Sequence, residues 1–583
     1  QWLAITKEIK DRQNEGKALG ALGLVYFVQE DYPKAIEYLQ QWLAIARQIK
    51  DRKSEGKALG SIGIVYGSSG NYPKAIEYFQ QHLAIAREMK DRESETIALR
   101  NLGIALFQSN KLLESEKTLF ESIDVLETLR GGLKDSDKVS IFDTQSDTYN
   151  TLQRVLIAEN KPDTALEVAE RGRARAFVEL LVKRLSNNPQ TTPPETIKPT
   201  ISELKRIAKE QNNTIIQYSV LNDIVKWGGK GQRQELELYI WVIKPTGEIT
   251  IRQSKLEAVL AQQPQLQAGE TRGTNPSSIE DLVLRSRESI FLAEETQTDN
   301  LQQLYQVLIK PIEDLLPTDP NDRVTFIPQG SLFLIPFPAL QDEKGKYLIE
   351  KHTILTAPAI QILDLTHKQR QLVTGKDILV VGNPTMPSIA SKIGETPEQL
   401  ENLPGAEAEA KAIAQLLNTK AYTGNEATKA AIVPQLANAK IIHLATHGLL
   451  DELKGLGLPI PGAIALAPSN NDNGLLTSSE ILDLKLHAEL VVLSACNTGK
   501  GKITGDGVIG LSRSIITAGV PTVIVSLWAV PDAPTASLMT EFYQNLQKSP
   551  DKAQALRQAM LKTMKEYPNP QDWAAFTAIG EAE

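Results

Sequence analysis

One thiol and one imidazole stand directly after two apolar runs, and together they could carry out nucleophilic chemistry. Cys496 is the only cysteine in the 583-residue chain and follows the apolar run 490–493. His447 lies 49 residues earlier and follows the run 440–446. Both runs are typical of buried strands, and open α/β sheets place catalytic groups at the carboxyl ends of strands. A thiol becomes a nucleophile when an imidazole takes its proton. The pattern therefore predicts acyl transfer, in which Cys496 attacks a peptide carbonyl and His447 protonates the leaving amine.

Backbone groups beside the same residues could stabilise the negative charge that forms on the carbonyl oxygen. Gly448 follows the histidine, and a glycine there lets the backbone turn tightly and aim its N–H at the oxyanion. The backbone N–H of Cys496 is the natural second donor. A lone cysteine is more commonly a small buried hydrophobic residue. Its position at a strand end, with a histidine about fifty residues upstream as in caspase-type cysteine proteases, favours the nucleophile.

Two other patterns suggest ligand sites, and neither is supported. His443 and His447 are four residues apart, which on a strand separates them by roughly 13 Å, too far to share one metal ion. His443 is predicted to pack against neighbouring elements instead. The glycines after Cys496 fit neither the dinucleotide pattern nor the Walker pattern. No metal or organic cofactor is required by the residues present.

Composition limits the classes of function. Hydrophobic residues make up 41% of the chain and charged residues 23%, which is ordinary for a soluble globular protein. The net charge of −8 argues against direct nucleic-acid binding, because such proteins normally carry a basic excess. A single cysteine excludes an intrachain disulfide and fits the reducing cytoplasm. No apolar run is long enough to span a membrane. The chain opens at Gln1 inside a helical pattern, which indicates a fragment of a longer protein.

The first 120 residues repeat with a period of 40. Each copy carries the same glycine, at Gly23, Gly63 and Gly103, and the same Asp-Arg corner. Apolar residues recur at helical spacing between the corners, which predicts helical hairpins with small residues where the two helices touch. The pattern over residues 1–130 resembles tetratricopeptide repeats. Stacked repeats of this kind present a concave surface for a protein or peptide partner.

A different organisation follows the repeats. Residues 131–185 are predicted to form one more degenerate helical hairpin, in which the cluster 170–175 lies on a solvated face, and residues 186–200 form a linker. Strand-like and helical segments then alternate, which predicts an α/β region with a mostly parallel sheet flanked by helices. The expected strands are 214–220, 236–243, 249–252, 324–327, 332–335, 377–381, 440–446, 463–467, 490–493, 522–527 and 574–579. The expected helices beyond residue 400 lie near 405–418, 426–437, 507–518, 533–547 and 551–566.

Five motifs in this region resemble the CHAT domain, the caspase-like peptidase domain related to separase, caspases and gingipains. They are Ala445-Thr-His-Gly448, Leu493-Ser-Ala-Cys-Asn-Thr-Gly499, Gly505-Asp-Gly-Val508, Ser526-Leu-Trp-Ala-Val-Pro-Asp532 and Trp573-Ala-Ala-Phe-Thr-Ala-Ile-Gly580. CHAT domains are typically joined to tetratricopeptide repeats, as here. The resemblance implies a companion subdomain without catalytic residues at 201–370 and a catalytic subdomain at 371–583. The chain departs from the family at Asn569-Pro570, where the family usually has His-Pro, outside the catalytic pair.

The resemblance also implies which residues contact a substrate. Ser526, Leu527 and Trp528 would form the edge segment that pairs with an extended substrate backbone. Asp532 would lie in the pocket for the residue before the cut and prefer a basic side chain, although it could equally cap the helix that follows. Asp506 is an alternative pocket acid.

We therefore expect a cytoplasmic cysteine endopeptidase whose repeats act as a docking or regulatory arm. A catalytically silent scaffold that binds proteins through its repeats is the main alternative. Cysteine-dependent hydrolysis of small acyl substrates is a third possibility.

Overall fold

The computed structural model of the chain divides into two compact units. The first comprises Gln1–Ala169 with Leu221–Leu236, and the second comprises Glu170–Val220 with Glu237–Glu583. The residues that the structure describes are 1–130, 135–186, 198–222, 236–254, 256, 279–292, 294–390, 396–449, 462–494, 502–504, 507–509, 511–528 and 531–583.

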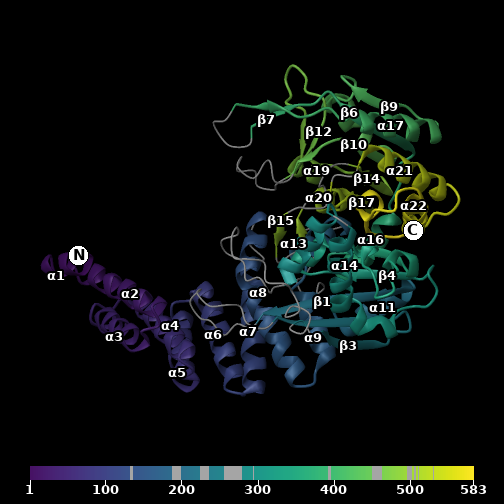
Figure 1. Cartoon of the computed structure of the whole chain (residues 1–583). Coiled ribbons are helices and arrows are strands. Elements are labelled where there is room, and N and C mark those ends of the chain that lie inside the picture. Colours follow the sequence, from purple (N-terminus) through teal and green to yellow (C-terminus); the bar gives the residue numbers. More distant parts are fainter. Residues whose placement is uncertain are drawn as a thin grey trace. The chain divides into compact units, whose positions relative to one another are not determined.

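Paired helices build the first unit (Figure 1). In chain order they are α1 (Trp2–Glu8), α2 (Arg12–Val28), α3 (Tyr32–Gln48), α4 (Arg52–Ser68), α5 (Tyr72–Glu88), α6 (Arg92–Gln108), α7 (Leu112–Arg130), α8 (Asp135–Ala158) and α9 (Pro162–Arg171). Helix α2 packs on α3, α4 on α5 and α6 on α7. A Cβ atom on Gly63 would lie 2.6 Å from the Phe79 ring, closer than side chains approach. The prediction of small residues at the helix contacts is confirmed.

The repeated Asp-Arg corner caps one helix and ties it to its neighbour. The Asp51 carboxylate accepts a hydrogen bond from the backbone N–H of Ser54 at 3.0 Å, which caps the start of α4. Glu55, only 7% exposed, accepts from Arg47 of α3 at 2.9 Å and from Arg52 at 2.6 Å. The buried carboxylate therefore holds successive hairpins together with charge-assisted hydrogen bonds.

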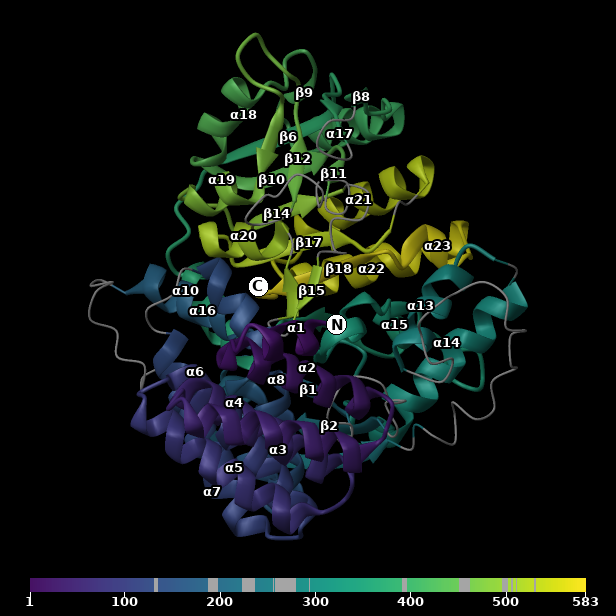
Figure 2. The same cartoon turned by 90° about the vertical axis from the view of Figure 1, so that its left-hand side faces the viewer.

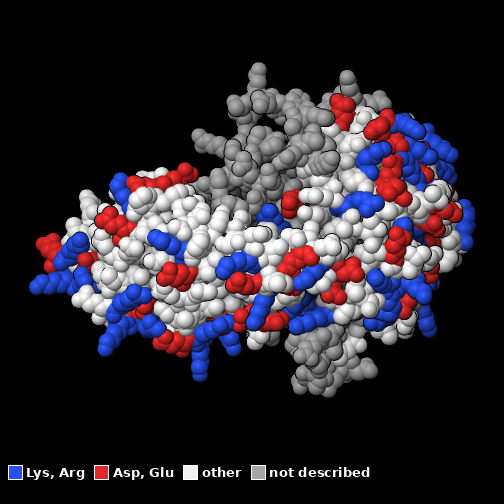
Figure 3. Space-filling view, turned by 90° about the horizontal axis from the view of Figure 1, so that it is seen from below, with Lys and Arg blue, Asp and Glu red and all other residues white. Residues whose placement is uncertain are grey.

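Charge of either sign is dispersed over the surface of the molecule that Figure 3 shows. On that face lysines and arginines lie among aspartates and glutamates rather than in one patch. The mixed surface agrees with the modest net charge of −8.

The framework of the second unit is a sheet of eleven strands, counted over the described residues. Its order is β3-β2-β1-β4-β5-β18-β17-β14-β10-β6-β9. The strands are β1 (Asn213–Asn222), β2 (Leu236–Ile243), β3 (Ile249–Ser254), β4 (Arg323–Ile327), β5 (Thr353–Thr356), β6 (Asp377–Pro384), β9 (Ala421–Gly424), β10 (Ala439–Ala445), β14 (Leu490–Leu493), β17 (Thr522–Ser526) and β18 (Phe576–Gly580). Parallel pairs join β1, β4 and β5, and also β17, β14, β10, β6 and β9, whereas β18 runs antiparallel to β17. The predicted fold class, helical repeats followed by a mostly parallel sheet flanked by helices, is confirmed.

Helices cover the sheet of the second unit (Figures 1 and 2). Apolar side chains of β6, β10, β14 and β17 share a core with α10 (Arg175–Leu185), α16 (Ile360–Arg370), α18 (Lys429–Leu436), α19 (Ser478–Asp483) and α20 (Leu511–Ala518). Helix α17 (Pro404–Leu416) packs on β6, on β10 and on α21 (Asp532–Leu546), which in turn packs on α22 (Lys552–Glu566). The remaining helical elements used below are α11 (Ile201–Glu210), α13 (Ile279–Ser289), η3 (Gly330–Leu334) and α23 (Pro570–Trp573).

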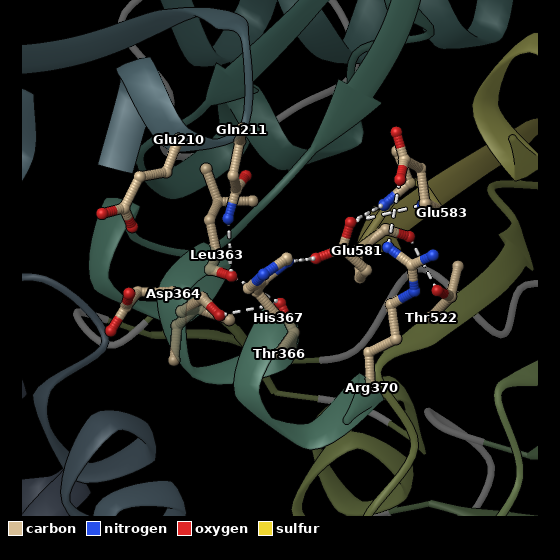
Figure 4. A network of polar contacts seen from close by, with 12 residues as sticks. Glu210, Gln211, Leu363, Asp364, Thr366, His367, Arg370, Thr522, Glu581 and Glu583 are labelled. Atoms are coloured by element: carbon tan, nitrogen blue, oxygen red, sulfur yellow. Dashed lines mark hydrogen bonds and ion pairs between the residues drawn. The ribbon is translucent and has the colours of Figure 1, made fainter. Parts of the chain in front are cut away.

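The last residues of the chain are held by an ion-pair network (Figure 4). Glu581 contacts the His367 ring at 2.9 Å, and Glu583 pairs with Arg370 at 3.1 Å. Glu583 also pairs with Arg323 at the start of β4 at 2.6 Å. These contacts fix the end of β18 to α16 and β4, so the strand that pairs antiparallel with β17 is anchored where it ends.

Several predicted elements differ in the structure. Residues 332–335, predicted as a strand, belong mostly to the 3-10 helix η3. The helix predicted near 507–518 begins at Leu511, because residues 507–509 pair as β16 with β15 (Lys502–Thr504). Strands β5 and β9 were not predicted, since each has only four residues and so carries little periodic signal.

The cluster 170–175 is buried, so its predicted solvated face is wrong. Arg171, Arg173 and Arg175 are 8%, 6% and 2% exposed. Arg173 donates to the backbone carbonyls of Tyr218 and Pro328, each at 2.5 Å, just beyond the last paired residues of β1 and β4. At least one of the basic residues that the sequence analysis placed in water, Arg173, therefore satisfies two backbone carbonyls.

Candidate active site at the ends of β10 and β14

The two strands that precede His447 and Cys496 are parallel neighbours in the sheet. Leu444 of β10 is paired with Leu493 of β14. Because neighbouring parallel strands point the same way, their carboxyl ends meet at one edge. In the sequence, position 447 lies three residues after Leu444, and position 496 lies three residues after Leu493. Cys496 and Asp506 themselves lie outside the described residues, which in this region resume only at β15 (Lys502–Thr504).

His447 is held by a backbone carbonyl. It is partly exposed, and its Nε2 lies 2.8 Å from the carbonyl oxygen of Glu401. A carbonyl oxygen only accepts hydrogen bonds, so this contact places a proton on Nε2. The neutral ring then carries its lone pair on Nδ1, which is the nitrogen that can take a further proton.

The segment that carries the Glu401 carbonyl is anchored at the end of β6. Asn383 adopts a left-handed conformation with φ of 44°. Its side chain accepts from the Leu403 N–H at 2.8 Å and donates to the Glu407 carboxylate at 3.1 Å. Sequence reasoning missed these residues, although an asparagine between Gly382 and Pro384 after a buried strand is a recognisable turn signal.

The residue after His447 belongs to a small antiparallel sheet of β11 (Gly448–Leu449), β12 (Ala463–Ala465) and β13 (Leu475–Thr477). The N–H of Ala465 donates to the His447 carbonyl at 2.9 Å. Backbone groups of successive residues face opposite sides of such a pair, so the Gly448 N–H is directed away from β12. Gly448 has no positive φ. The tight turn predicted for Gly448 is therefore wrong, and a short strand presents its N–H instead.

His443 lies in the core, as predicted. It is fully buried, and its Nδ1 lies 3.2 Å from the hydroxyl of Tyr543 on α21. Its Nε2 lies 3.1 Å from the carboxylate of Glu409 on α17. Burial, with the nearby charge of Glu409, raises the pKa of Tyr543 well above its usual range. His443 thus joins β10 to two helices and does not share a site with His447.

The segment predicted to pair with a substrate continues β17. Ser526, Leu527 and Trp528 are 2%, 2% and 3% exposed. The Leu527 N–H donates to the Ala575 carbonyl at 2.8 Å, and the Leu527 carbonyl accepts from Arg287 at 2.8 Å. Both backbone groups of Leu527 thus have partners within the chain, and a substrate could pair with Leu527 only if those bonds were broken.

The residue before Leu527 faces the other way. Residues in an antiparallel pair alternate between facing the partner strand and facing away from it. Since Leu527 faces Ala575, the backbone groups of Ser526, the last residue of β17, are directed toward the β14 side. The last residue of β17 that pairs with β14 is Val525. Any strand added at this position would therefore meet Ser526 first.

Asp532 is exposed and opens α21, where Pro531 is the N-cap residue. Its side chain lies over the first turn of α17, because a Cβ on Gly405 would overlap the Asp532 carboxyl group. Two helix N-termini therefore meet at this carboxylate, and both favour its negative charge. The arrangement is compatible with a role in helix stability and with a role in binding a cation.

Within the parts of the chain that the structure describes, no three His, Cys, Asp or Glu side chains gather where a metal ion could be held. None of the described helices is both long and apolar enough to cross a bilayer.

Comparison with known proteins accounts for both units. Residues 14–88 match a tetratricopeptide repeat family, and residues 298–581 match the CHAT domain. The chain is a tetratricopeptide-repeat protein with a CHAT domain. It is similar to tetratricopeptide repeat protein 28 of Homo sapiens, 27% identical over 607 residues, and to that of Mus musculus, 27% identical over 596 residues. Each alignment covers 82% of this chain but only 24% of the relative, so the chain spans about a quarter of their length.

Among solved structures, separase in the separase–securin complex of Saccharomyces cerevisiae aligns with 100% of this chain and 48% of its own. The sequence identity is 12% and the TM-score is 0.47.

The matched CHAT domain contains His447, position 496, the segment 526–528 and Asp532. It does not contain Arg287, which donates to Leu527 from α13, upstream of residue 298. One buried contact to the candidate site therefore comes from outside the matched CHAT domain.

Proposed function

We propose that this chain is a cysteine endopeptidase that uses Cys496 as nucleophile and His447 as general base and acid. The observation that carries the proposal is the register of β10 against β14. Leu444 and Leu493 lie opposite one another in parallel strands, and the histidine and the cysteine each follow three residues later. Equal offsets from a paired position favour side chains that meet at the same edge.

The contact of His447 with Glu401 supports its role. With its proton on Nε2 directed to the carbonyl, the ring offers Nδ1 to the thiol. Nδ1 takes the proton of Cys496, and the thiolate sulfur forms a bond to the substrate carbonyl carbon. The N–H groups of Gly448 and Cys496 would donate to the resulting oxyanion.

The remaining steps use the same two side chains. The protonated His447 gives its proton to the leaving nitrogen as the C–N bond breaks, which leaves a thioester on Cys496 and releases an amine. His447 then takes a proton from water, and the hydroxide oxygen displaces the thiolate. The products are a carboxylic acid and the regenerated thiol, and no metal or redox partner is needed for the balance.

For substrate recognition we propose that an extended peptide pairs with Ser526 and Trp528 beyond the last pair of β17 with β14. Leu527 between them is occupied by Ala575 and Arg287. Asp532, with Asp506 as the alternative, would contact a basic residue before the cut. The repeats of the first unit would bind a protein partner on their concave surface and act as a docking or regulatory arm.

Peptide cleavage tests this proposal directly. Fluorogenic peptides that end in Arg, Lys, Asp or Leu are assayed with the wild type, Cys496→Ala and His447→Ala. We expect each substitution to lower kcat/KM at least about a thousandfold, because the two groups act as one unit. Unchanged melting temperatures would show that folding is intact. Cleavage that survives Cys496→Ala would contradict the proposal.

The same assay separates the alternatives. A silent scaffold would cleave nothing, and its Cys496 would react with iodoacetamide no faster than a free thiol. A hydrolase of small acyl groups would turn over esters without any dependence on peptide length. An endopeptidase should instead prefer peptides long enough to reach Trp528.

A further inference from the structure

A buried arginine from outside the matched CHAT domain reaches the end of β17. Arg287 of α13 is 9% exposed. It donates through Nη2 to the Leu527 carbonyl at 2.8 Å and through Nη1 to the Leu334 carbonyl at 3.1 Å. One side chain therefore joins two segments that are far apart in the sequence.

This arrangement is costly for a cation. Among the described residues, the acceptors of Arg287 are two uncharged carbonyls and not a carboxylate. Burial lowers the pKa of its guanidinium to about 10. A buried charge without an ionic partner opposes folding unless hydrogen bonds compensate its lost hydration. An apolar residue would fill the same space but would leave both carbonyls without this donor, so the arginine is explained by its hydrogen bonds and not by packing alone.

The two carbonyls belong to the proposed substrate segment and to η3. Leu527 follows Ser526, whose backbone groups face the β14 side. Leu334 ends η3, and η3 packs against both β15 and β16. That pair of strands is the next described part of the chain after Ser494 and position 496. Arg287 is therefore bonded to the substrate segment and to the support of the loop region that follows the nucleophile.

Phe291, two residues after the end of α13, makes a second contact with the segment 526–528. The ring of Phe291 meets the Trp528 ring edge-on, with ring centres 6.4 Å apart. The Trp528 indole N–H is in turn bonded to the carbonyl of Gln571 in α23 at 3.0 Å. Two consecutive residues of the substrate segment thus depend on α13, one through its backbone and one through its side chain.

We propose that Arg287 is a positioning residue that fixes the conformation of the segment 526–528, so that Ser526 at the end of β17 is presented to a peptide substrate. It acts through Leu527 and does not touch the reacting atoms. This inference rests on the proposed peptidase function for its kinetic consequence, but the ordering of the segment can be measured without catalysis. The proposal therefore gives a residue that precedes the matched CHAT domain a role in peptide recognition.

The test compares Arg287→Met with Arg287→Lys and with a matched control, Arg285→Met. Arg285 lies on the same helix, is partly exposed and bonds to the Asp281 carbonyl within its own helix. Amide hydrogen exchange at 526–528 reports the order of the segment. We expect at least tenfold faster exchange there in Arg287→Met, a smaller increase in Arg287→Lys and none in Arg285→Met.

Kinetics provide the second readout. With peptides that fill four positions before the cut, Arg287→Met should raise KM at least tenfold and change kcat much less. Alkylation of Cys496 by iodoacetamide should stay within twofold of the wild type, since the thiol and His447 are untouched. Equal effects of Arg285→Met and Arg287→Met would overturn the inference, as would unchanged exchange at 526–528 in Arg287→Met.

The two readouts also separate this inference from the proposed function. If the wild type cleaves no peptide while exchange rises only in the Arg287 variants, the peptidase proposal fails and the positioning role stands. If Arg287→Met does not fold, Arg287→Lys replaces it, and unchanged exchange in that variant contradicts the inference.

Discussion

Two pairs of parallel strands in one sheet end in opposite ways. Beyond the last pair of β1 with β4, the carbonyls of Tyr218 and Pro328 both accept from the buried guanidinium of Arg173. Beyond the last pair of β10 with β14, the chain continues to His447, which is partly exposed and bonded to the Glu401 carbonyl. The first end is closed by a side chain from the segment between α9 and α10, whereas the second presents a titratable ring.

The difference shows that the end of a parallel strand pair can either be closed by a buried side chain or lead to a partly exposed one. Carbonyls left at the end of a parallel pair must find donors, and a buried arginine supplies several at once. The β1–β4 end is thus closed by an internal donor, and the proposed chemistry is assigned to the ends of β10 and β14.

The largest effect on stability should come from removing Arg173, the side chain that closes the β1–β4 end. Arg173→Ala leaves two buried carbonyls without their donor, so we expect the free energy of unfolding to fall by about 3 to 5 kcal/mol. Urea unfolding measures this loss. Arg184→Ala is the matched control, because the exposed Arg184 also donates to two carbonyls, those of Leu482 and Leu484. That variant should lose less than about 1 kcal/mol. Equal losses of unfolding free energy in the two variants would show that the buried Arg173 contact stabilises the fold no more than an exposed one.

A pH dependence should follow from the same closed end. Burial raises the pKa of Glu170 from 4.5 to about 7, against the opposing effects of the Gln361 N–H and the charge of Arg173. A raised folded-state pKa means that the folded protein holds its proton longer than the unfolded chain does. The stabilisation is therefore complete below about pH 4.5 and is lost as the pH rises through 7, by about 3 kcal/mol in all.

Glu170→Gln removes this titration and should flatten the slope of unfolding free energy between pH 5 and pH 8. Urea unfolding at several pH values gives the comparison. The exposed Glu210, paired with Arg206, supplies the control variant Glu210→Gln, whose slope should match that of the wild type. A slope that Glu170→Gln leaves unchanged would place the titrating group elsewhere.

The smallest effect concerns the open end. If Asp532 contacts a basic residue, Asp532→Asn should lower kcat/KM for peptides with Arg before the cut about tenfold and leave peptides with Leu unaffected. If Asp532 only stabilises its helix, all peptides should change together and the melting temperature should fall. Asp483→Asn, another exposed acid, is the control. Assays with the paired peptides distinguish the two roles.

The contacts that the candidate residues make were harder to predict from the sequence than the residues themselves. Apolar runs located β10 and β14 along the chain, because buried strands leave a strong pattern. The same reasoning placed Arg171, Arg173 and Arg175 in water, since arginine is usually exposed. Only the position of β1 and β4 shows that Arg173 has buried acceptors. The contact that holds His447 was missed for a similar reason. Its acceptor is the backbone carbonyl of Glu401, and a backbone group leaves no side-chain signal in the sequence.

What the amino-acid sequence determined by itself is local or repetitive. Short patterns in the sequence predict the helices, the corner aspartates, the small residues at helix contacts and the buried strands. Each pattern is a few residues long and acts through contacts between neighbouring residues, so it has the same effect wherever it occurs. Only the tertiary structure decided that β10 lies beside β14, that the Glu401 carbonyl, just before α17, contacts His447, and that Arg287 reaches Leu527. Those contacts join segments as many as 240 residues apart, and they depend on how all the intervening elements pack.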